Sequence, residues 1–229
     1  MADRCLLYYI TDRTQFPGDQ SARRRALLAK IGEAARSGVD YIQLREKDLS
    51  ARQLEKLATD AVRTIHEARA AQGKQQSATR LLINSRTDVA LAAGADGVHL
   101  RSDDISAATA RSIWQQATAR DSQLAARGFL IAVSCHSASD VIRAESDRAD
   151  FVVFAPVFGK TKRDAREIHA QGIDALRAAC TAKIPVLALG GVTLENAASC
   201  LAAGAAGIAG IRLFQENKIE DVIRALRVT

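Results

Sequence analysis

The chain has 229 residues, of which 48% are hydrophobic and 25% are charged, which supplies one sizeable core and favours a single domain over residues 1–229. Lys and Arg outnumber Asp and Glu by 32 to 26. This basic balance permits nucleic acid or phosphorylated small molecules as partners, although a solvated Arg-rich surface explains it equally well. An aromatic content of 4% argues against nucleic acid as a partner, because few rings are present to stack on bases.

The apolar runs and the cysteines indicate the cellular compartment in which the protein is expected. No apolar run approaches the roughly 18 residues that a membrane span requires, so we expect no membrane partner. The four cysteines are far apart and form no C-x-x-C pair, which argues against a disulfide framework and a zinc ribbon. We therefore expect a cytoplasmic protein. The sequence leaves open whether it forms a homo-oligomer.

Continuous apolar runs mark the first predicted strands, which are typical of a parallel sheet covered by helices. The clearest runs are residues 5–10, 81–83, 129–133 and 185–189. Stretches with helical periodicity follow, such as residues 107–117 and 194–202.

A repeat completes the architecture. At four places a helix-like stretch ends in small residues and breaks into strand-forming residues, at Asp40, Asp96, Asp150 and Ala206, which are 56, 54 and 56 residues apart. A period of about 55 residues corresponds to two βα units. Four periods give eight strands, so the sequence predicts an α/β protein with a (β/α)8 barrel.

Polar residues at the carboxyl ends of barrel strands carry the chemistry in this fold. After the second strand, alternation places Gln43, Arg45 and Lys47 on one side, where Arg and Lys suit a diphosphate. A surface network of Arg–Glu or Lys–Asp pairs is the alternative.

The next two strands are followed by further polar groups. Asn84 can contact a heterocycle, or Ser85 or Thr87 can cap the following helix. Asp103 and Asp104 can bind Mg²⁺ together with substrate phosphates, or they can start a helix by favouring its dipole. His99, within the fourth strand, fits a packed core residue better than a ligand.

The fifth strand ends with Ser134 and His136 on one side, and an imidazole there suits proton transfer near neutral pH. Ser137 as the cap of a new helix is the alternative explanation. Cys135 is expected to point outward, which argues against a Cys–His nucleophilic pair.

Two later regions suit anions. The basic loop at residues 160–166 fits a mobile lid over an anion, with a merely solvated loop as the alternative. Gly190 and Gly191 after the seventh strand, with Ile211 and Arg212 after the eighth, predict backbone amides that approach a phosphate.

Taken in order, several motifs resemble the superfamily of thiamine phosphate synthases and the related thiazole tautomerases. The resemblance covers nearly the whole chain through YITD at 9–12, QLREKD at 43–48, GADGVHL at 94–100, APVF at 155–158 and GGVT at 190–193. In the synthase branch, a hydroxymethylpyrimidine diphosphate loses Mg²⁺-bound pyrophosphate, and the nitrogen of a thiazole phosphate captures the pyrimidine cation.

The resemblance implies roles for individual residues. The diphosphate ligands would be Gln43, Arg45 and Lys47; the substrate and pyrophosphate contacts Asn84 and Ser134; the Mg²⁺ ligand Asp104; the lid contacts Thr161 and Lys162; and the thiazole phosphate site Gly190, Gly191, Ile211 and Arg212. The catalytic set expected from both branches is Arg45, Ser134, His136 and Lys162.

The chain also departs from the synthase pattern. Ser85 replaces an expected metal carboxylate, Arg101-Ser102 stands where Gly-Gln is usual, and Arg212 replaces a Ser. The tautomerase branch needs no Mg²⁺ and would use His136 to move a proton, but it typically lacks the full QLREK series. We therefore expect a synthase-like enzyme, with an isomerase of the tautomerase type and a non-catalytic thiazole-phosphate-binding barrel as alternatives.

Overall fold

The computed structural model describes residues 4–71, 79–119, 128–161, 167–168 and 170–227. Eight parallel strands close into a barrel in the order β1-β10-β9-β6-β5-β4-β3-β2, which confirms the predicted fold. The barrel strands are β1 (Leu6–Ile10), β2 (Tyr41–Leu44), β3 (Arg80–Asn84), β4 (Gly97–Leu100), β5 (Leu130–Cys135), β6 (Phe151–Phe154), β9 (Val186–Ala188) and β10 (Gly207–Gly210).

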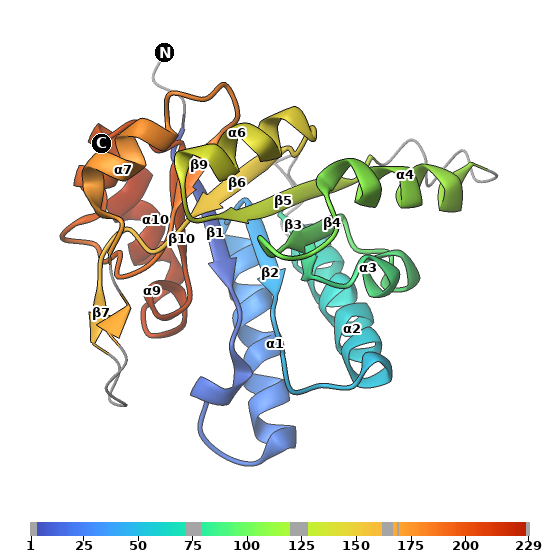
Figure 1. Cartoon of the computed structure of the whole chain (residues 1–229). Coiled ribbons are helices and arrows are strands. Elements are labelled where there is room, and N and C mark those ends of the chain that lie inside the picture. Colours follow the sequence, from blue (N-terminus) through green and yellow to red (C-terminus); the bar gives the residue numbers. More distant parts are fainter. Residues whose placement is uncertain (1–3, 72–78, 120–127, 162–166, 169, 228–229) are drawn as a thin grey trace.

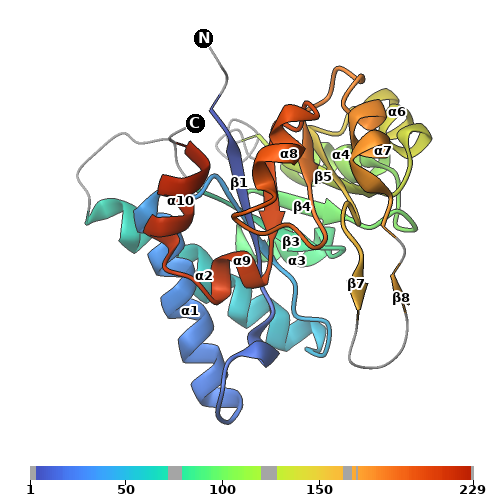
Figure 2. The same ribbon diagram turned by 90° about the vertical axis from the view of Figure 1, so that its left-hand side faces the viewer.

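Helices lie outside this barrel (Figures 1 and 2). They are η1 (Arg13–Gln15), α1 (Gln20–Ser37), α2 (Ala51–Ala70), α3 (Thr87–Ala93), α4 (Ala107–Thr118), α6 (Ala138–Ser146), α7 (Gly172–Ala179), α8 (Ala197–Ala202), α9 (Arg212–Gln215) and α10 (Ile219–Arg227). The helix expected at residues 194–202 begins only at Ala197, because a turn held by the Asn196 side chain precedes it.

Strand alternation divides the apolar residues into two clusters. Tyr8 and Ile10 point into the barrel, where they pack with Leu82, Phe151 and other inward residues. Residues one position away, such as Tyr9, join the larger cluster between strands and helices. Both faces of the strands are therefore buried, which explains why their sequences are predominantly apolar.

The repeat seen in the sequence has a common hydrogen-bonding basis. The carboxylates of Asp40, Asp96 and Asp150 each accept a hydrogen bond from the backbone N–H at or next to the start of the preceding strand, at 2.8, 2.8 and 2.7 Å. Each aspartate also forms an ion pair with at least one arginine. Ala206, at the fourth repeat point, has no side-chain acceptor and connects to β9 through its backbone N–H. The aspartates thus join successive strands at the amino-terminal rim.

The described residues at and next to the basic segment after β6 are not wholly loop. They form two short antiparallel strands, β7 (Lys160–Thr161) and β8 (Glu167–Ile168). Both views show this hairpin projecting from the end of the barrel opposite the two chain termini (Figures 1 and 2). The hairpin therefore lies at the end where the barrel strands finish.

Candidate active site

A pocket of about 1030 Å³ opens at the carboxyl ends of the strands. It gathers predicted site residues from the ends of five different strands, namely Gln43, Arg45, Asn84, Ser134, His136, Gly190, Gly191, Ile211 and Arg212. His99, Arg101 and Asp103 also line it. Cationic, amide and hydroxyl groups therefore surround one space large enough for two small ligands.

Strand β2 places only part of the predicted diphosphate set in this pocket. Gln43 is buried and donates to Asn84 Oδ1 at 3.2 Å, while Arg45 is half-buried. The strand ends at Leu44 and the chain then turns, so alternation does not continue to Lys47. Lys47 is exposed and lies outside the described lining of the pocket, contrary to our placement of it beside Gln43 and Arg45.

A buried ion cluster holds the backbone beside Arg45. Glu46 and Arg13 are only 5% and 3% exposed, and the Arg13 guanidinium donates to Glu46 at 3.1 Å and to Asp48 at 2.5 Å. The Thr11 hydroxyl donates to Glu46 at 2.7 Å and accepts the backbone N–H of Arg45 at 3.0 Å. An ion-pair network is therefore present, but its central pair is internal rather than at the surface, and it fixes the ends of β1 and β2.

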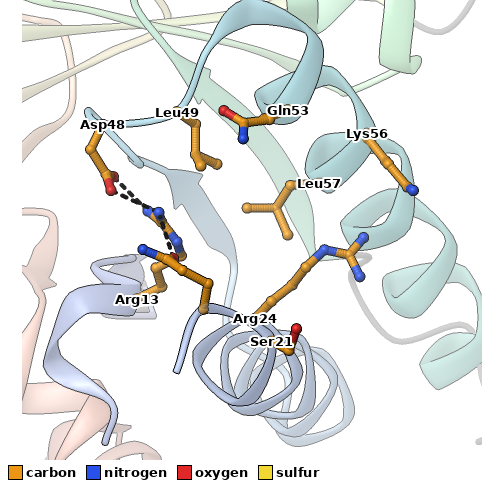
Figure 3. Close-up of a pocket in the computed structure, with 9 residues that line it drawn as sticks. Arg13, Ser21, Arg24, Asp48, Leu49, Gln53, Lys56 and Leu57 are labelled. Atoms are coloured by element: carbon orange, nitrogen blue, oxygen red, sulfur yellow. Dashed lines mark hydrogen bonds and ion pairs between the residues drawn. The ribbon is translucent and has the colours of Figure 1, made fainter. Parts of the chain in front are cut away.

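Figure 3 shows Arg13 and Asp48 of this cluster on the lining of a second pocket, of about 450 Å³, between α1 and α2. The Arg13 side chain points to Asp48 there, and dashed lines mark their contacts. Arg24, on the α1 side of the pocket, pairs with Asp60. Because two of the cations lining this pocket are already neutralised, we place the substrate site at the barrel mouth.

The segment after β3 carries an unusual backbone. Ser85 adopts a φ of 61°, a left-handed conformation that Asn and Asp tolerate better than most residues. Asn84 donates to the Ser85 hydroxyl at 3.1 Å. Neither Ser85 nor Thr87 caps α3, since Arg86 occupies the cap position without a side-chain bond.

Asp104 lies in a turn before α4, whose cap is Ser106, so the helix-start interpretation of Asp103 and Asp104 is wrong. Asp104 accepts the Arg101 backbone N–H at 2.7 Å, and Arg101 Nη2 donates to it at 3.1 Å. Partial burial acts to raise the pKa of Asp104, but hydrogen bonds from the Ser85 side chain and from Arg101 outweigh it and hold that pKa below its ordinary value. The carboxylate is thus ionised and engaged with Arg101.

His99 is 2% exposed, as a core histidine should be, yet it also contacts the site. Its Nε2 lies 2.8 Å from Ser134 Oγ, and its Nδ1 lies 3.0 Å from the Tyr8 hydroxyl. Burial first, and then the charge of Arg45, lower its pKa to about 3, so the ring is neutral. Sequence reasoning missed this link because Tyr8, His99 and Ser134 belong to three different strands.

The end of β5 places His136 at the mouth and also makes Ser137 the cap of the next helix. His136 is exposed at the mouth, with Nδ1 2.6 Å from the carbonyl oxygen of Ala155. Ser137 caps α6 by accepting the Asp140 N–H at 3.1 Å. Cys135 is buried on the helix side, and burial raises the pKa of its thiol to about 12, which rules against a thiolate nucleophile there.

Packing within the protein, and not only a ligand, explains why two glycines stand after β9. Gly190 and Gly191 have φ values of 98° and 66°. A Cβ on Gly190 would lie 2.7 Å from Pro156 Cα, and one on Gly191 would lie 2.7 Å from Phe158 Cβ. Only glycine therefore lets this loop cross the segment after β6, and a side chain there would strike that segment first.

Two predicted lid residues have no described side-chain geometry. Thr161 belongs to β7, and Lys162 lies outside the described residues.

The described ranges contain few groups arranged as metal ligands. Within them, no cluster of three or more His, Cys, Asp or Glu side chains is placed to hold a metal.

Comparison with known proteins decides the family. The family model described as thiamine monophosphate synthase matches residues 7–214. The chain belongs to the thiamine monophosphate synthase family. Within the helices described, none is long and apolar enough to cross a membrane.

Individual members of the thiamine monophosphate synthase family resemble this chain over most of its length. A protein of Geobacter sulfurreducens provisionally named thiamine-phosphate synthase is 45% identical over 89% of this chain and 83% of its own length. The thiamine-phosphate synthase of Methanoculleus marisnigri is 35% identical over 96% of this chain and 93% of its own length.

A solved structure agrees with this family. The thiamine phosphate pyrophosphorylase of Pyrococcus furiosus superposes with a TM-score of 0.73 at 28% identity, covering 99% of this chain and 95% of that one. Since these relatives carry the synthase name, the isomerase alternative gains no support from them.

Proposed function

We propose that this protein is a thiamine-phosphate synthase that joins hydroxymethylpyrimidine diphosphate to thiazole phosphate and releases pyrophosphate. The observation that carries the proposal is the shared pocket. Gln43, Arg45 and Ser134 line one part of it, and the loops after β9 and β10, with Gly191 and Arg212, line another. One part suits a diphosphate and the other a monophosphate, as a reaction between two phosphorylated substrates requires.

The chemistry follows from the donors in the pocket. The bond between the pyrimidine methylene and the diphosphate oxygen breaks with both electrons going to pyrophosphate, and the thiazole nitrogen then donates its lone pair to the resulting cation. Negative charge grows on the departing oxygens, where the Arg45 guanidinium and the Ser134 and Gln43 side chains supply hydrogen bonds. Fixed donors of this kind lower the barrier because they are oriented before charge develops.

We propose Mg²⁺ as the cofactor, held by Asp104 together with the phosphate oxygens of the substrate. The donors fit a weak site: Mg²⁺ often binds through one or two carboxylates plus substrate phosphates, and Asp104 provides one ionised carboxylate beside the Ser85 side chain. When bound, the metal would neutralise charge on the leaving pyrophosphate. Arg101 already pairs with Asp104, so metal binding requires that this contact be exchanged.

The functional test compares both candidate reactions. Purified protein should form thiamine phosphate and pyrophosphate from the two synthase substrates in the presence of Mg²⁺. It should not isomerise the exocyclic thiazole carboxylate phosphate at a comparable rate. Turnover of that isomer alone would replace the proposal with the tautomerase, and binding of thiazole phosphate without either reaction would replace it with a regulatory barrel.

A further inference from the structure

Three side chains form a hydrogen-bonded row from the barrel interior to the pocket. Tyr8, on β1, is fully buried, and its hydroxyl lies 3.0 Å from His99 Nδ1. His99 Nε2 in turn lies 2.8 Å from Ser134 Oγ. Ser134 lines the pocket, so the row connects a buried phenol with the place where the diphosphate is proposed to bind.

The hydrogen-bond partners of Tyr8 set the direction of this row. In the described part of the chain, His99 Nδ1 is the hydrogen-bond partner found for the Tyr8 hydroxyl. A buried O–H that does not donate loses the bond it had in water, so the phenol donates to Nδ1. A neutral imidazole carries one proton, which must then be on Nε2, from where it is donated to Ser134 Oγ.

We propose that Tyr8 and His99 are positioning residues that hold the Ser134 hydroxyl as a hydrogen-bond donor toward the pocket. Ser134 Oγ accepts the hydrogen bond from His99 Nε2. The Ser134 O–H therefore does not donate to His99, and it is directed to an acceptor atom of the ligand. The inference rests on the proposed function and deepens it, since that acceptor is an oxygen of the departing pyrophosphate. His99 is therefore not a base that activates Ser134.

The surroundings keep this arrangement fixed. The Tyr8 ring packs edge-on against both Tyr41 and Phe151, with ring centroids 5.9 and 5.5 Å apart. His99 is enclosed on strand β4, and a charge on its ring is opposed by burial and by Arg45. A neutral ring with one defined tautomer can orient a neighbour without exchanging protons with it.

The tautomer can be measured in the wild-type protein. Histidine labelled with ¹⁵N gives signals from four residues, and His99→Gln identifies the signal of His99 by its loss. We expect two-bond ¹H–¹⁵N correlations to show Nε2 protonated and Nδ1 unprotonated, without change between about pH 8 and about pH 5.5. A proton on Nδ1 would overturn the proposal.

A double-mutant cycle measures whether His99 acts through Ser134. Ser134→Ala and His99→Leu should each lower kcat on the order of 10²-fold, with the KM for thiazole phosphate unchanged. The double variant should be no slower than the slower single variant. Losses that multiply would show that His99 acts independently of Ser134 and would overturn the inference.

His99→Gln is the matched control, because its amide can still donate to Ser134 and accept from Tyr8. It should retain most of the kcat that His99→Leu loses; equal losses would count against the inference. Inorganic pyrophosphate with Mg²⁺ supplies a readout independent of turnover: both Ser134→Ala and His99→Leu should weaken its binding to a similar extent. If the wild type forms no thiamine phosphate, the proposed function is wrong. The measured tautomer of His99 and the measured binding of pyrophosphate then still test this inference, because neither depends on turnover.

Discussion

The buried His99 makes a quantitative prediction for stability at mildly acid pH. Its folded-state pKa of about 3 lies below the ordinary value of 6.5, so the folded protein favours the neutral ring. The unfolded chain takes up a proton first as pH falls, and stability therefore decreases with decreasing pH in the window from about 6.5 toward about 3.

The size of the effect follows from the two pKa values. Each pH unit within that window changes the free energy of unfolding by about 1.4 kcal/mol. A change from about pH 7.5 to about pH 5 ends roughly 1.5 pH units below the ordinary pKa of 6.5. His99 should therefore lower the free energy of unfolding by about 2 kcal/mol over this change.

Urea denaturation at these two pH values, with wild type and His99→Gln, isolates this contribution, because the carboxylates titrate in both proteins. The variant should lose less stability than the wild type on acidification, by about 2 kcal/mol. His66→Gln, on an exposed position of α2, is the control and should behave as the wild type. Equal pH dependence in wild type and His99→Gln would refute the reasoning.

Other positions give independent tests. Ser85→Asp combined with Arg101→Gly should raise synthase activity and lower the Mg²⁺ concentration needed, measured by initial rates across a Mg²⁺ titration; no gain at saturating substrates would refute the metal-site account. Gly191→Ala should lower the free energy of unfolding by about 1–2 kcal/mol in urea denaturation, because the left-handed backbone disfavours a Cβ. Glu46→Gln leaves the buried Arg13 with the more exposed Asp48 as its remaining carboxylate partner, so thermal denaturation should show a loss of about 1–3 kcal/mol. Asp96→Ala removes the acceptor of a strand N–H and should cost about 1–3 kcal/mol by the same measurement.

Much of the architecture could be predicted because it depends on local patterns. Apolar runs locate the strands, and the spacing of Asp40, Asp96 and Asp150 reflects one recurring hydrogen bond at the start of alternate strands. Closure of parallel strands then brings their carboxyl ends together. For this reason Gln43 and Ser134, far apart in the sequence, both line one pocket.

Contacts between distant side chains could not be predicted in the same way. Strand alternation predicts the side on which Lys47 lies only if β2 continues to that residue. Because β2 ends at Leu44 and the chain then turns, the prediction fails there. Arg13 and Glu46 are buried together as an ion pair. Neither residue type predicts burial from the sequence, because both are usually exposed. The pairing of Arg101 with Asp104 likewise depends on the turn that the segment adopts.

The distribution of ion pairs between the two barrel ends affects how fast substrates arrive. At the amino-terminal rim, arginines neutralise Asp40, Asp96 and Asp150. At the mouth, Arg45 and Arg212 form no ion pair within the described residues, although both line the pocket. These two guanidinium groups can therefore pair with an entering anion, although Glu195 and Glu216 line the same pocket, and salt weakens such pairing by screening it. Raising the ionic strength should therefore slow substrate capture, seen in kcat/KM, more than it slows turnover at saturation.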